Sequence, residues 1–572
     1  MEAQALYRQI LSLHPNHIQT LYKIGQLARQ FGQNAAAIEL FTRVVTLKPD
    51  WPDAHNDLGN TLLDARRIGA AIVEYEKALA LRTDFAEAWN NLGNAQRLLS
   101  RLDEAIDAYR RALAVRPDLA EAHSNLGNVL KDTGALDEAL TCYRRAAELK
   151  PDPRIAGSFL YAMHLHPDYG PRQIYQEHAR WNQTYARPLA ATIAPHDNVP
   201  DPQRRLRIGY VSPDFTANPV GRFLVPFLSN HDHARFEIFC YSDTRRPDVT
   251  TERLRACADT WRSMVGLSDE HLAATIREDR IDILIDLTLH AADNRLPVFA
   301  RKPAPIQVSY LAYCSTTGLE TMDYRFSDPF FDPHLSENPG SGNDPIYSER
   351  TIRLPRTYWC YGPPEQAGPV GPAPAASIGH VTFGCLNNFS KVNPAVLATW
   401  ARLMRAVEGS ELILHSGQGS HRRRVHEYFA GEKIDPRRVR FIARLPLAEY
   451  FDQYRQIDVG LDPFPFPGGT TTCDALWMGV PVVSLAGATA VSRGGLSILS
   501  NVGLPQLVAR TPDEYVSIAA ALAGDLSRLT ELRSRLRQKM QASPLMDGPG
   551  FARDVDSAFR QMWRAWVSMV SC

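Results

Sequence analysis

The segment from Phe464 to Trp477 has the residue types that a phosphate-binding turn needs. Two glycines let the backbone come close to a ligand, and the three threonines after them open a predicted helix whose dipole favours an anion at this end. Asp474, one turn further on, can accept hydrogen bonds from sugar hydroxyls. The segment therefore suits the phosphates and ribose of a nucleotide, through contacts expected at Gly468, Gly469, Thr470, Thr471 and Thr472. The alternative is a Thr471-x-x-Asp474 capping box that only starts a helix.

The residues around this segment alternate between strand and helix patterns. A strand is predicted over residues 457–461, and the helix after the glycines must end at Gly479 because Pro481 follows. Two parallel α/β domains in tandem are indicated, and ligands bind at the carboxyl ends of such strands. The other predicted strands are residues 206–212, 236–241, 281–287, 306–310, 380–385, 411–416, 439–442 and 481–485, and helices between them include 220–228, 251–264 and 271–278.

The N-terminal part of the chain is repetitive. The motif A-x-x-x-L-G-N begins at Ala54, Ala88 and Ala122, 34 residues apart, and a weaker copy begins at Thr20. The period and the pattern resemble the tetratricopeptide repeat (TPR), a helix–turn–helix unit. Residues 7–15 fit the second helix of an earlier unit, so we expect the chain to begin within the solenoid. One glycine in each first helix is expected to let the paired helices pack closely: Gly25, Gly59, Gly93 and Gly127.

A TPR stack forms a concave groove that can bind a peptide. Asn91 and Asn125 recur at one position of the first helix, and Asp57 stands in the matching place. Repeated amides can hydrogen-bond a peptide backbone whatever its sequence, so these residues are the predicted acceptor-peptide contacts. The alternative is that they lie on a solvated helix face.

Composition limits the expected partners and location. Formal net charge is zero without a basic block, which argues against nucleic acid as the main partner. The N-terminus lacks the features of a signal peptide, and no apolar run approaches the roughly 20 residues of a membrane span. Eight scattered cysteines include no C-x-x-C, and no H-E-x-x-H is present. We therefore expect a cytoplasmic protein with reduced cysteines, no membrane partner and no zinc site.

Five motifs, together with the repeats, resemble the O-GlcNAc transferase family, including its plant SPINDLY branch. They are the segments Arg207–Phe215, Arg301–Gln307, Met322–Tyr324, Cys385–Pro394 and Gly468–Trp477. The implied fold is an α-solenoid of TPR repeats followed by an α/β GT-B fold of two Rossmann-like domains. The predicted boundaries are a TPR superhelix at 1–151, a helical linker at 152–203, an N-terminal Rossmann-like domain at 204–361, a linker at 362–379, a C-terminal nucleotide-sugar domain at 380–545 and a final helix at 546–572.

The implied activity is inverting transfer of GlcNAc from UDP-GlcNAc to Ser or Thr of polypeptides, with the repeats recruiting the acceptor. No cofactor and no metal are expected. The one D-x-D motif, Asp554–Asp556, lies in the final helix, where we expect a solvated face and no metal site. The apolar stripe of the same helix predicts packing. Alternatives are a GDP-fucose or UDP-glucose donor, or a repeat scaffold whose transferase half is impaired. Whether the protein is also a homodimer stays open.

Residue roles follow from the resemblance, position by position. Lys391 matches the lysine that contacts the diphosphate, and Asn388 matches a polar neighbour of the same phosphates. Thr470 and Thr471 match the phosphate-binding threonines, and Asp474 matches the carboxylate that holds the ribose. The remaining implied contacts are Leu445 and Leu447 at the uracil ring and Arg493 as a support of the cleft, for which a structural role is the alternative.

The sequence departs from the family near the reaction centre. Asn218 stands where the family usually has a histidine, and an amide is no general base, although it can orient the acceptor. The base is then His290, Asp214 or a phosphate oxygen of the donor, or the enzyme is slow or inactive. His290 follows Leu289, which stands where relatives usually have glycine, and a packed or substrate-lining His290 is the alternative to a catalytic one.

Overall fold

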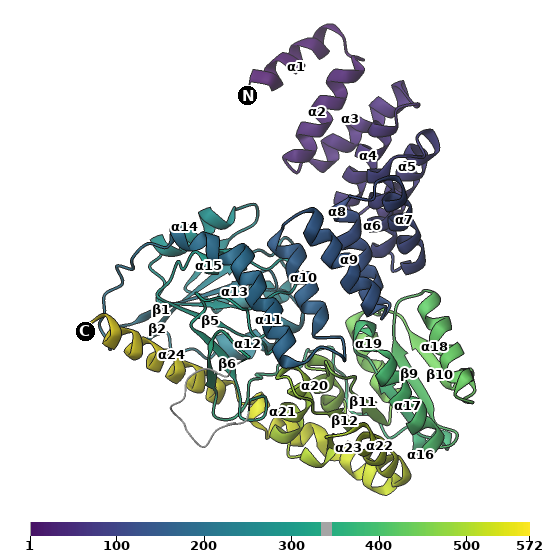
Figure 1. The fold of residues 1–572 in the computed structure, drawn as a ribbon, viewed down its shortest axis with the longest axis vertical. Helices are drawn as coiled ribbons and strands as arrows, with labels where there is room; N and C mark the ends of the chain where they lie inside the picture. The colour runs from purple at the N-terminus through teal and green to yellow at the C-terminus, as the bar shows by residue number, and fades with distance from the viewer. Residues whose placement is uncertain (1, 333–345, 572) are drawn as a thin grey trace. The chain divides into compact units, whose positions relative to one another are not determined.

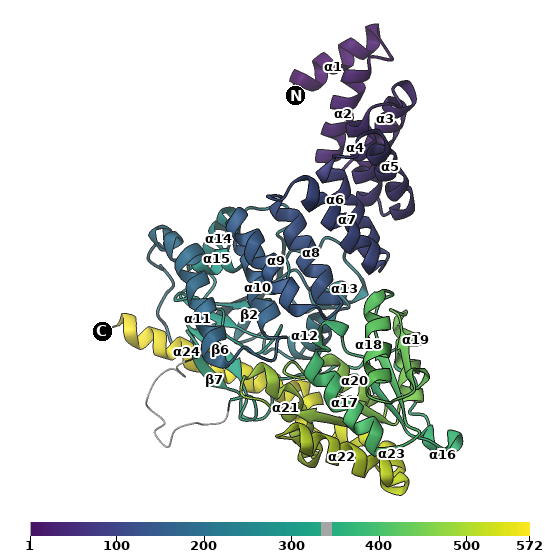
Figure 2. The same cartoon turned by 45° about the vertical axis from the view of Figure 1, so that its right-hand side comes forward.

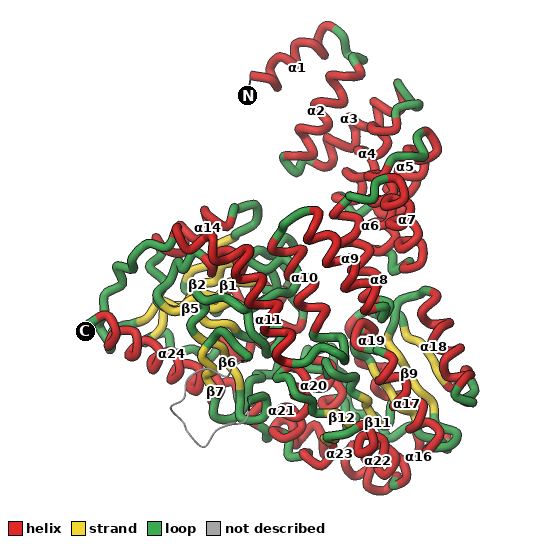
Figure 3. The backbone as a smooth tube through the Cα atoms, in the orientation of Figure 1, coloured by secondary structure: helices red, strands yellow, loops and turns green. Residues whose placement is uncertain are grey.

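We analysed the protein as a computed structural model that describes residues 2–332 and 346–571. The chain divides into two compact units, residues 1–151 with 417–423, and residues 152–416 with 424–572. Figure 1 and, after a turn of 45°, Figure 2 show the course of the chain. Figure 3 shows that strands begin only after the repeats. Within the described ranges, none of the helices is long and apolar enough to cross a membrane.

The first unit consists of paired antiparallel helices, as the 34-residue period predicts. A Cβ on Gly59 would lie 2.6 Å from the ring of Tyr75, whose hydroxyl donates to Asn60 Oδ1 at 2.9 Å. The L-G-N motif thus makes room for a tyrosine and accepts its hydroxyl. The same arrangement recurs as Gly93–Tyr109–Asn94 and Gly127–Tyr143–Asn128. The helices are α1 Glu2–Leu13, α2 Ile18–Gln30, α3 Asn34–Leu47, α4 Pro52–Asp64, α5 Ile68–Leu81, α6 Ala86–Leu98, α7 Leu102–Val115, α8 Ala120–Asp132 and α9 Leu136–Leu149.

The second unit begins with a helical segment that packs against the first α/β domain. It comprises α10 (Pro153–Met163), α11 (Pro171–Trp181) and two short helices, η1 (Asn182–Ala186) and η2 (Arg187–Thr192). Tyr161 of α10 contacts the ring of Tyr313 edge-on, with 5.5 Å between ring centroids. Residues 152–203 therefore carry side chains into the transferase unit and do more than bridge it to the repeats.

Among the residues that the structure describes, the first α/β domain holds a seven-stranded parallel sheet in the order β3-β2-β1-β4-β5-β6-β7. Its central strands are buried on both faces, which explains their continuous apolar runs. The strands are β1 Leu206–Ser212, β2 Phe236–Ser242, β3 Thr260–Ser263, β4 Ile283–Asp286, β5 Ile306–Ser309, β6 Tyr324–Ser327 and β7 Arg350–Arg353, and the helices are α12 Pro219–Leu228, α13 Val249–Ala256, α14 Asp269–Glu278 and α15 Leu296–Ala300.

The second α/β domain holds a six-stranded parallel sheet in the order β10-β9-β8-β11-β12-β13. Its strands are β8 Thr382–Cys385, β9 Glu411–His415, β10 Val439–Ile442, β11 Val459–Leu461, β12 Val482–Leu485 and β13 Val508–Ala509. The helices are α16 Ala375–Ile378, α17 Pro394–Ala406, α18 Ser420–Gly431, α19 Leu447–Gln453, α20 Thr470–Trp477, α21 Gly494–Asn501, α22 Pro512–Gly524 and α23 Leu526–Gln541, with short helices η3 to η8 between them.

The helix predicted over residues 251–264 is wrong in its second half. Helix α13 ends at Ala256, and residues Thr260–Ser263 form the edge strand β3, parallel to β2. Asp259 accepts the backbone N–H of Ile238 at 2.7 Å, which fixes the chain beside the sheet. Tertiary pairing therefore overrides a local pattern that could also be read as helical.

The final helix, α24 (Gly548–Val570), packs on the first α/β domain after the chain has left the second. Asp556 accepts from His231 Nδ1 at 2.7 Å, and Asp554 accepts from Arg356 Nε at 2.9 Å. The expected solvated face is therefore wrong for these two residues, because the carboxylate of Asp556 is buried beside His231 and that of Asp554 is partly buried beside Arg356. The buried stripe that includes Phe559 and Trp563 confirms the predicted packing.

Candidate active site

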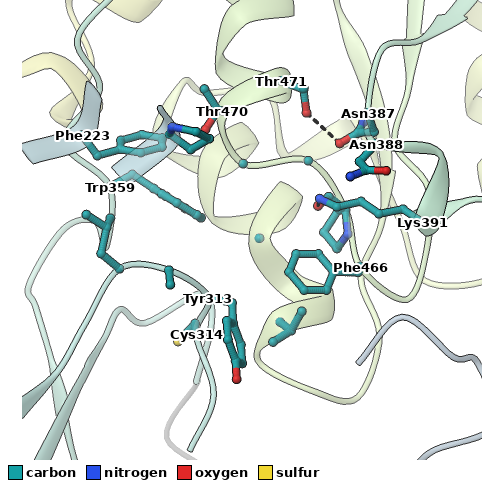
Figure 4. A pocket seen from close by; sticks show the side chains of 18 of the residues that line it. Phe223, Tyr313, Cys314, Trp359, Asn387, Asn388, Lys391, Phe466, Thr470 and Thr471 are labelled. Carbon is teal, nitrogen blue, oxygen red and sulfur yellow. Dashed lines mark hydrogen bonds between the residues drawn. The ribbon is translucent and has the colours of Figure 1, made fainter. Parts of the chain in front are cut away.

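A cavity of about 270 Å³ lies between the two α/β domains, at the carboxyl ends of their strands. Figure 4 shows the side chains around it. One wall is apolar and comes mainly from the first domain, and the other is polar and comes from the second. The lining includes Val220, Phe223, Tyr313, Cys314 and Trp359 on the first side, Asn387, Asn388, Lys391, Gly468, Gly469, Thr470 and Thr471 on the second, and Tyr161 and Phe466.

The glycine–threonine segment forms the turn that the sequence predicts. A Cβ on Gly469 would lie 2.9 Å from the ring of Trp359, so the turn can approach the opposite wall only without a side chain. Asp462 holds the turn by accepting the N–H of Gly468 at 3.2 Å and the hydroxyl of Thr472 at 2.9 Å. Burial raises the pKa of Asp462 to about 6. Thr472 therefore supports the turn from behind, away from the cavity.

Helix α20 begins at the cavity without a side-chain cap. Its N-cap is Gly469, and the hydroxyl of Thr471 donates to Asn387 Oδ1 at 2.7 Å (Figure 4). The alternative capping box between Thr471 and Asp474 therefore does not form. The first N–H groups of α20 point their dipole at the cavity, which is the geometry that binds phosphate in many proteins.

Lys391 supplies the positive charge of the polar wall. Its Nζ donates to the carbonyl of Pro467 at 2.8 Å and lies 4.3 Å from the ring centroid of Phe466. Burial lowers the pKa of Lys391 to about 8, against the opposing effect of Asp462. Within the described part of the chain, no carboxylate forms an ion pair with this ammonium group, so an anion in the cavity would be its counter-ion.

Asp474 does not line the cavity, although the resemblance assigns it to the ribose. It is 1% exposed, and Arg222, Tyr361 and Tyr450 all donate to its carboxylate. Leu445 and Leu447 are also absent from the lining; Leu447 begins α19 and is 37% exposed. The predicted ribose contact, Asp474, is thus covered by protein donors, whereas the predicted phosphate contacts Lys391, Thr470 and Thr471 line the cavity.

Asn218 stands at the rim of the cavity as the N-cap of α12. Its Oδ1 accepts the N–H of Gly221 at 3.0 Å, and its Nδ2 donates to Asp214 Oδ1 at 2.6 Å. Burial raises the pKa of Asp214, and the hydrogen bond from Asn218 opposes that shift. Pro219 and Val220, which follow directly, are part of the lining. Asn218 therefore orients this helix and Asp214 together.

His290 does not line the cavity and is 1% exposed, and its backbone N–H donates to the hydroxyl of the lining residue Tyr313 at 3.2 Å. Its Nε2 donates to the carbonyl of Thr317 at 2.7 Å, and its ring packs edge-on against Trp181 and His178. Burial lowers the pKa of His290 well below its usual value, so the ring is neutral. This placement agrees with the packed alternative. The residue before it, Leu289, has φ of +49°, a backbone conformation that favours glycine.

The other predicted contacts lie as follows. Arg493 is partly buried, and its neighbours Val491 and Gly494 line the cavity although it does not. In the repeats, Asn91 Nδ2 donates to Asn56 Oδ1 and Asn125 Nδ2 to Asn90 Oδ1, each at 3.0 Å, while Asp57 accepts from Tyr22 and Gln26. These amides join neighbouring repeats and each keeps an oxygen for a further donor.

The sequence did not predict two features of the site: the aromatic residues of the apolar wall, and Arg222. Tyr161, Phe223 and Trp359 come from segments read only as helix or domain boundary, and no local pattern marks them as cavity residues. Arg222 lies four residues after Asn218, at the end of the motif Asn218–Arg222 in which the family usually has a histidine at the first position. Its reach to Asp474, 252 positions away in the chain, is set by tertiary structure.

The described residues contain no group of three or more His, Cys, Asp or Glu side chains that could hold a metal ion. The fold and the site together define a class, a TPR solenoid joined to a GT-B fold with a phosphate-type turn in the cleft. A family model for glycosyl transferase family 41 matches residues 189–361 and 376–555, and tetratricopeptide models match within residues 1–153. The chain belongs to glycosyl transferase family 41.

Relatives in this family carry the names expected from the resemblance. The chain is 40% identical over 402 residues to the probable UDP-N-acetylglucosamine–peptide N-acetylglucosaminyltransferase SPINDLY of Petunia hybrida, covering 69% of this chain and 42% of the relative. It is 29% identical over 376 residues to the Arabidopsis thaliana protein of the same description called SEC, covering 64% and 38%. The chain thus spans less than half the length of the curated relatives it matches.

A solved structure is similar over nearly the whole chain. It is a mutant of Thermobaculum terrenum O-GlcNAc transferase, 37% identical, with a TM-score of 0.84, covering 91% of this chain and 98% of that one. The arrangement of repeats followed by two parallel sheets is therefore a known fold, and the prediction of a TPR solenoid with a GT-B fold is confirmed.

Proposed function

We propose that this protein transfers GlcNAc from UDP-GlcNAc to Ser or Thr side chains of polypeptides, with inversion and without a divalent metal. The observation that carries the proposal is the polar wall, where Lys391 and the start of α20 face one cavity. A desolvated ammonium group and a helix N-terminus together suit a diphosphate. The names of the relatives in the same family support the donor and the acceptor class.

The chemical step needs most help at the leaving group. The acceptor hydroxyl attacks the anomeric carbon in line, and the C–O bond to the diphosphate breaks as the new bond forms. Negative charge then grows on the departing diphosphate, where Lys391 and the N–H groups of Thr470 and Thr471 stabilise it. These preorganised groups do the work that a divalent cation does in other transferases.

The proton of the acceptor hydroxyl also needs a destination. Within the described residues, the lining of the cavity contains neither a histidine nor a carboxylate. We therefore assign the proton to a phosphate oxygen of the donor. Asp214, which accepts from Asn218 Nδ2, is the protein group that we propose as the alternative. This route lacks the roughly 10²–10⁴-fold that a positioned base contributes, so we expect a slow enzyme.

The first test is turnover in the presence of EDTA with UDP-GlcNAc, UDP-glucose and GDP-fucose and with proteins from a lysate as acceptors. We expect UDP release matched by a HexNAc mass on Ser or Thr. Release from GDP-fucose would move the donor assignment and keep the mechanism. Absence of turnover with every donor contradicts the proposal.

The role of the repeats is tested separately. We propose that Asn91 and Asn125 hydrogen-bond the acceptor backbone. Replacing both by alanine should raise KM for protein acceptors several-fold and leave the turnover of a short peptide unchanged, because an acceptor that occupies the cavity alone makes no contact with the repeats. An equal effect on both acceptors would point to a loss of fold, which thermal unfolding would reveal.

A further inference from the structure

Arg222 joins the two α/β domains directly behind the cavity. From α12 of the first domain, its Nη1 donates to Asp474 Oδ2 at 3.1 Å and its Nη2 donates to Asp474 Oδ1. Asp474 lies on α20 of the second domain. The pairing is bidentate and buried, with side-chain exposures of 12% for Arg222 and 2% for Asp474. Two-point arginine–carboxylate pairs are among the strong interactions in proteins.

The pair lies one helical turn behind the phosphate wall. Thr470 and Thr471 of α20 and Pro219 and Val220 of α12 line the cavity. Asp474 follows Thr470 by four residues, about 6 Å along the helix. A third element meets the pair, because Tyr450 of α19 donates to Asp474 Oδ2 at 3.2 Å. Helix α19 begins at Leu447, one of the two predicted contacts of the base.

Arg222 is therefore linked through Asp474 to the two elements predicted to hold the ends of a nucleotide. Asp474 lies on α20, which begins with Thr470, and it accepts from Tyr450 of α19, which begins with Leu447. The Asp474 carboxylate already accepts from Arg222, from Tyr361 at 2.7 Å and from Tyr450. Hydroxyls of a ribose can bond to this carboxylate only by displacing one of these donors.

The guanidinium group is itself incompletely satisfied. Among the described residues, Arg222 Nε is buried and has no hydrogen-bond partner. A buried donor without an acceptor destabilises the state that contains it. A diphosphate beside α12 would offer acceptors to this arginine once it leaves the carboxylate.

We propose that Arg222 occupies the ribose position in the donor-free protein and is displaced by the nucleoside of the donor. The freed guanidinium then bonds the diphosphate, next to Lys391. Arg222 is thus a specificity-determining residue that exchanges one anionic partner for another when a complete nucleoside diphosphate arrives. The inference rests on the proposed donor site and adds the residue that couples its two halves.

The competing explanation is that Arg222 has only a structural role and holds the two α/β domains together. The binding of two ligands, uridine and UDP, distinguishes this role from the proposal. Uridine carries the ribose without phosphates, and UDP carries both. If Arg222 competes with ribose, its removal should raise the affinity for uridine. If Arg222 also bonds the diphosphate, its removal should lower the affinity for UDP relative to that for uridine. Loss of an arginine that only holds the domains together would affect both ligands alike.

The experiment measures Kd of uridine and of UDP by calorimetry for wild-type protein, Arg222→Met and Arg222→Lys. Arg253→Met is the matched control, because Arg253 of α13 also forms an ion pair, with Glu365, far from the cavity lining. For Arg222→Met we expect at least threefold tighter uridine binding and a roughly tenfold smaller preference for UDP over uridine, as for loss of one charged hydrogen bond. Arg222→Lys keeps a cation but not the fork, so uridine binding should tighten while the preference changes less than threefold.

Several results would overturn the proposal. If uridine and UDP both bind more weakly to Arg222→Met by the same factor, Arg222 has only a structural role. If the preference of Arg222→Met for UDP over uridine is unchanged, Arg222 does not bind the diphosphate. If Arg222→Met does not fold, uridine binding by Arg222→Lys becomes the test. Unchanged or weaker uridine binding by this variant contradicts the exchange. Wild-type protein that binds neither UDP nor GDP contradicts the donor site itself, whereas binding that is insensitive to Arg222 contradicts only the exchange.

Discussion

The two walls of the cavity differ in chemistry and in how closely they follow the family pattern. The wall from the second domain carries Lys391, the glycine turn and the threonines in the predicted arrangement. The wall from the first domain is mainly aromatic, and Asn218 at its rim replaces the usual histidine. For the proposed transfer, this difference means that the groups for the leaving diphosphate are in place, while proton removal from the acceptor is the weak step.

The largest effect should come from the polar wall. Lys391→Ala should lower kcat about 10²–10³-fold, the range for losing one preorganised electrostatic group at a developing anion. The fold should be retained, because Nζ bonds only a backbone carbonyl, of Pro467, among the described residues. The measurement is UDP release with circular dichroism as the check on folding.

Lys539→Ala is the matched control for that loss, since Lys539 is exposed on α23 of the same domain. It should transfer at the wild-type rate. Full activity in Lys391→Ala would mean that the polar wall is not the site of the diphosphate.

The pH dependence of donor binding tests the same wall through its charge. Burial lowers the pKa of Lys391 to about 8, so the ammonium is present below pH 8 and is lost as the pH rises through that value. UDP affinity should therefore be level near pH 7 and fall by up to about tenfold per pH unit above 8, because the anion prefers the charged lysine. Calorimetry between about pH 6.5 and 9.5 measures the Kd of UDP for the wild-type protein and for Lys391→Ala. The variant is the control and should show no such fall in affinity.

The contact between the walls can be tested at Gly469. A Cβ there would lie 2.9 Å from the Trp359 ring, so Gly469→Ala must push the ring or the turn and should weaken UDP binding about tenfold, in line with the roughly 1–3 kcal/mol that overpacking costs. Gly524→Ala is the control, because a Cβ at Gly524 meets nothing within 4 Å. Equal binding by both variants would show that this close approach is not needed for the donor.

The smallest change is expected at the first wall. Asn218→His should transfer at least as fast as wild type and gain several-fold if the new imidazole reaches the acceptor, which is less than the roughly 10²–10⁴-fold that a fully positioned general base contributes. A histidine can keep the cap of α12, as His17 does for α2 by accepting the N–H of Thr20 at 3.3 Å. Single-turnover rates report the gain, and a large loss would mean that the amide of Asn218 has a role of its own.

The sequence predicts this fold well where the pattern is local. The 34-residue period fixes the repeats because each Gly–Tyr–Asn set is built within one helix pair. The glycine turn can be predicted equally well from the sequence, since its glycines and threonines act through their own backbone. Strands β6 and β7 were missed because they are short and partly polar; Arg325 in β6 is buried and pairs with Asp332.

Side chains that meet across domains could not be predicted in the same way. His290 is chemically suited to catalysis, but its packing against Trp181 depends on α11, a helix with no motif. The carboxylate of Asp474 is suited to ribose, but its present partner Arg222 comes from the other domain. The left-handed backbone at Leu289 is kept where relatives have glycine, because its side chain packs with Tyr313 and Val491.

Helix α24 has a consequence for how the transferase unit can move. The chain passes from the first α/β domain to the second through residues 362–379 and returns before Gly548, so two covalent segments cross between the domains. Two connecting segments define one rotation axis between the domains and oppose relative twisting or sliding in other directions. Opening of the cavity should therefore be a single swing, in which displacement grows with distance from these crossings.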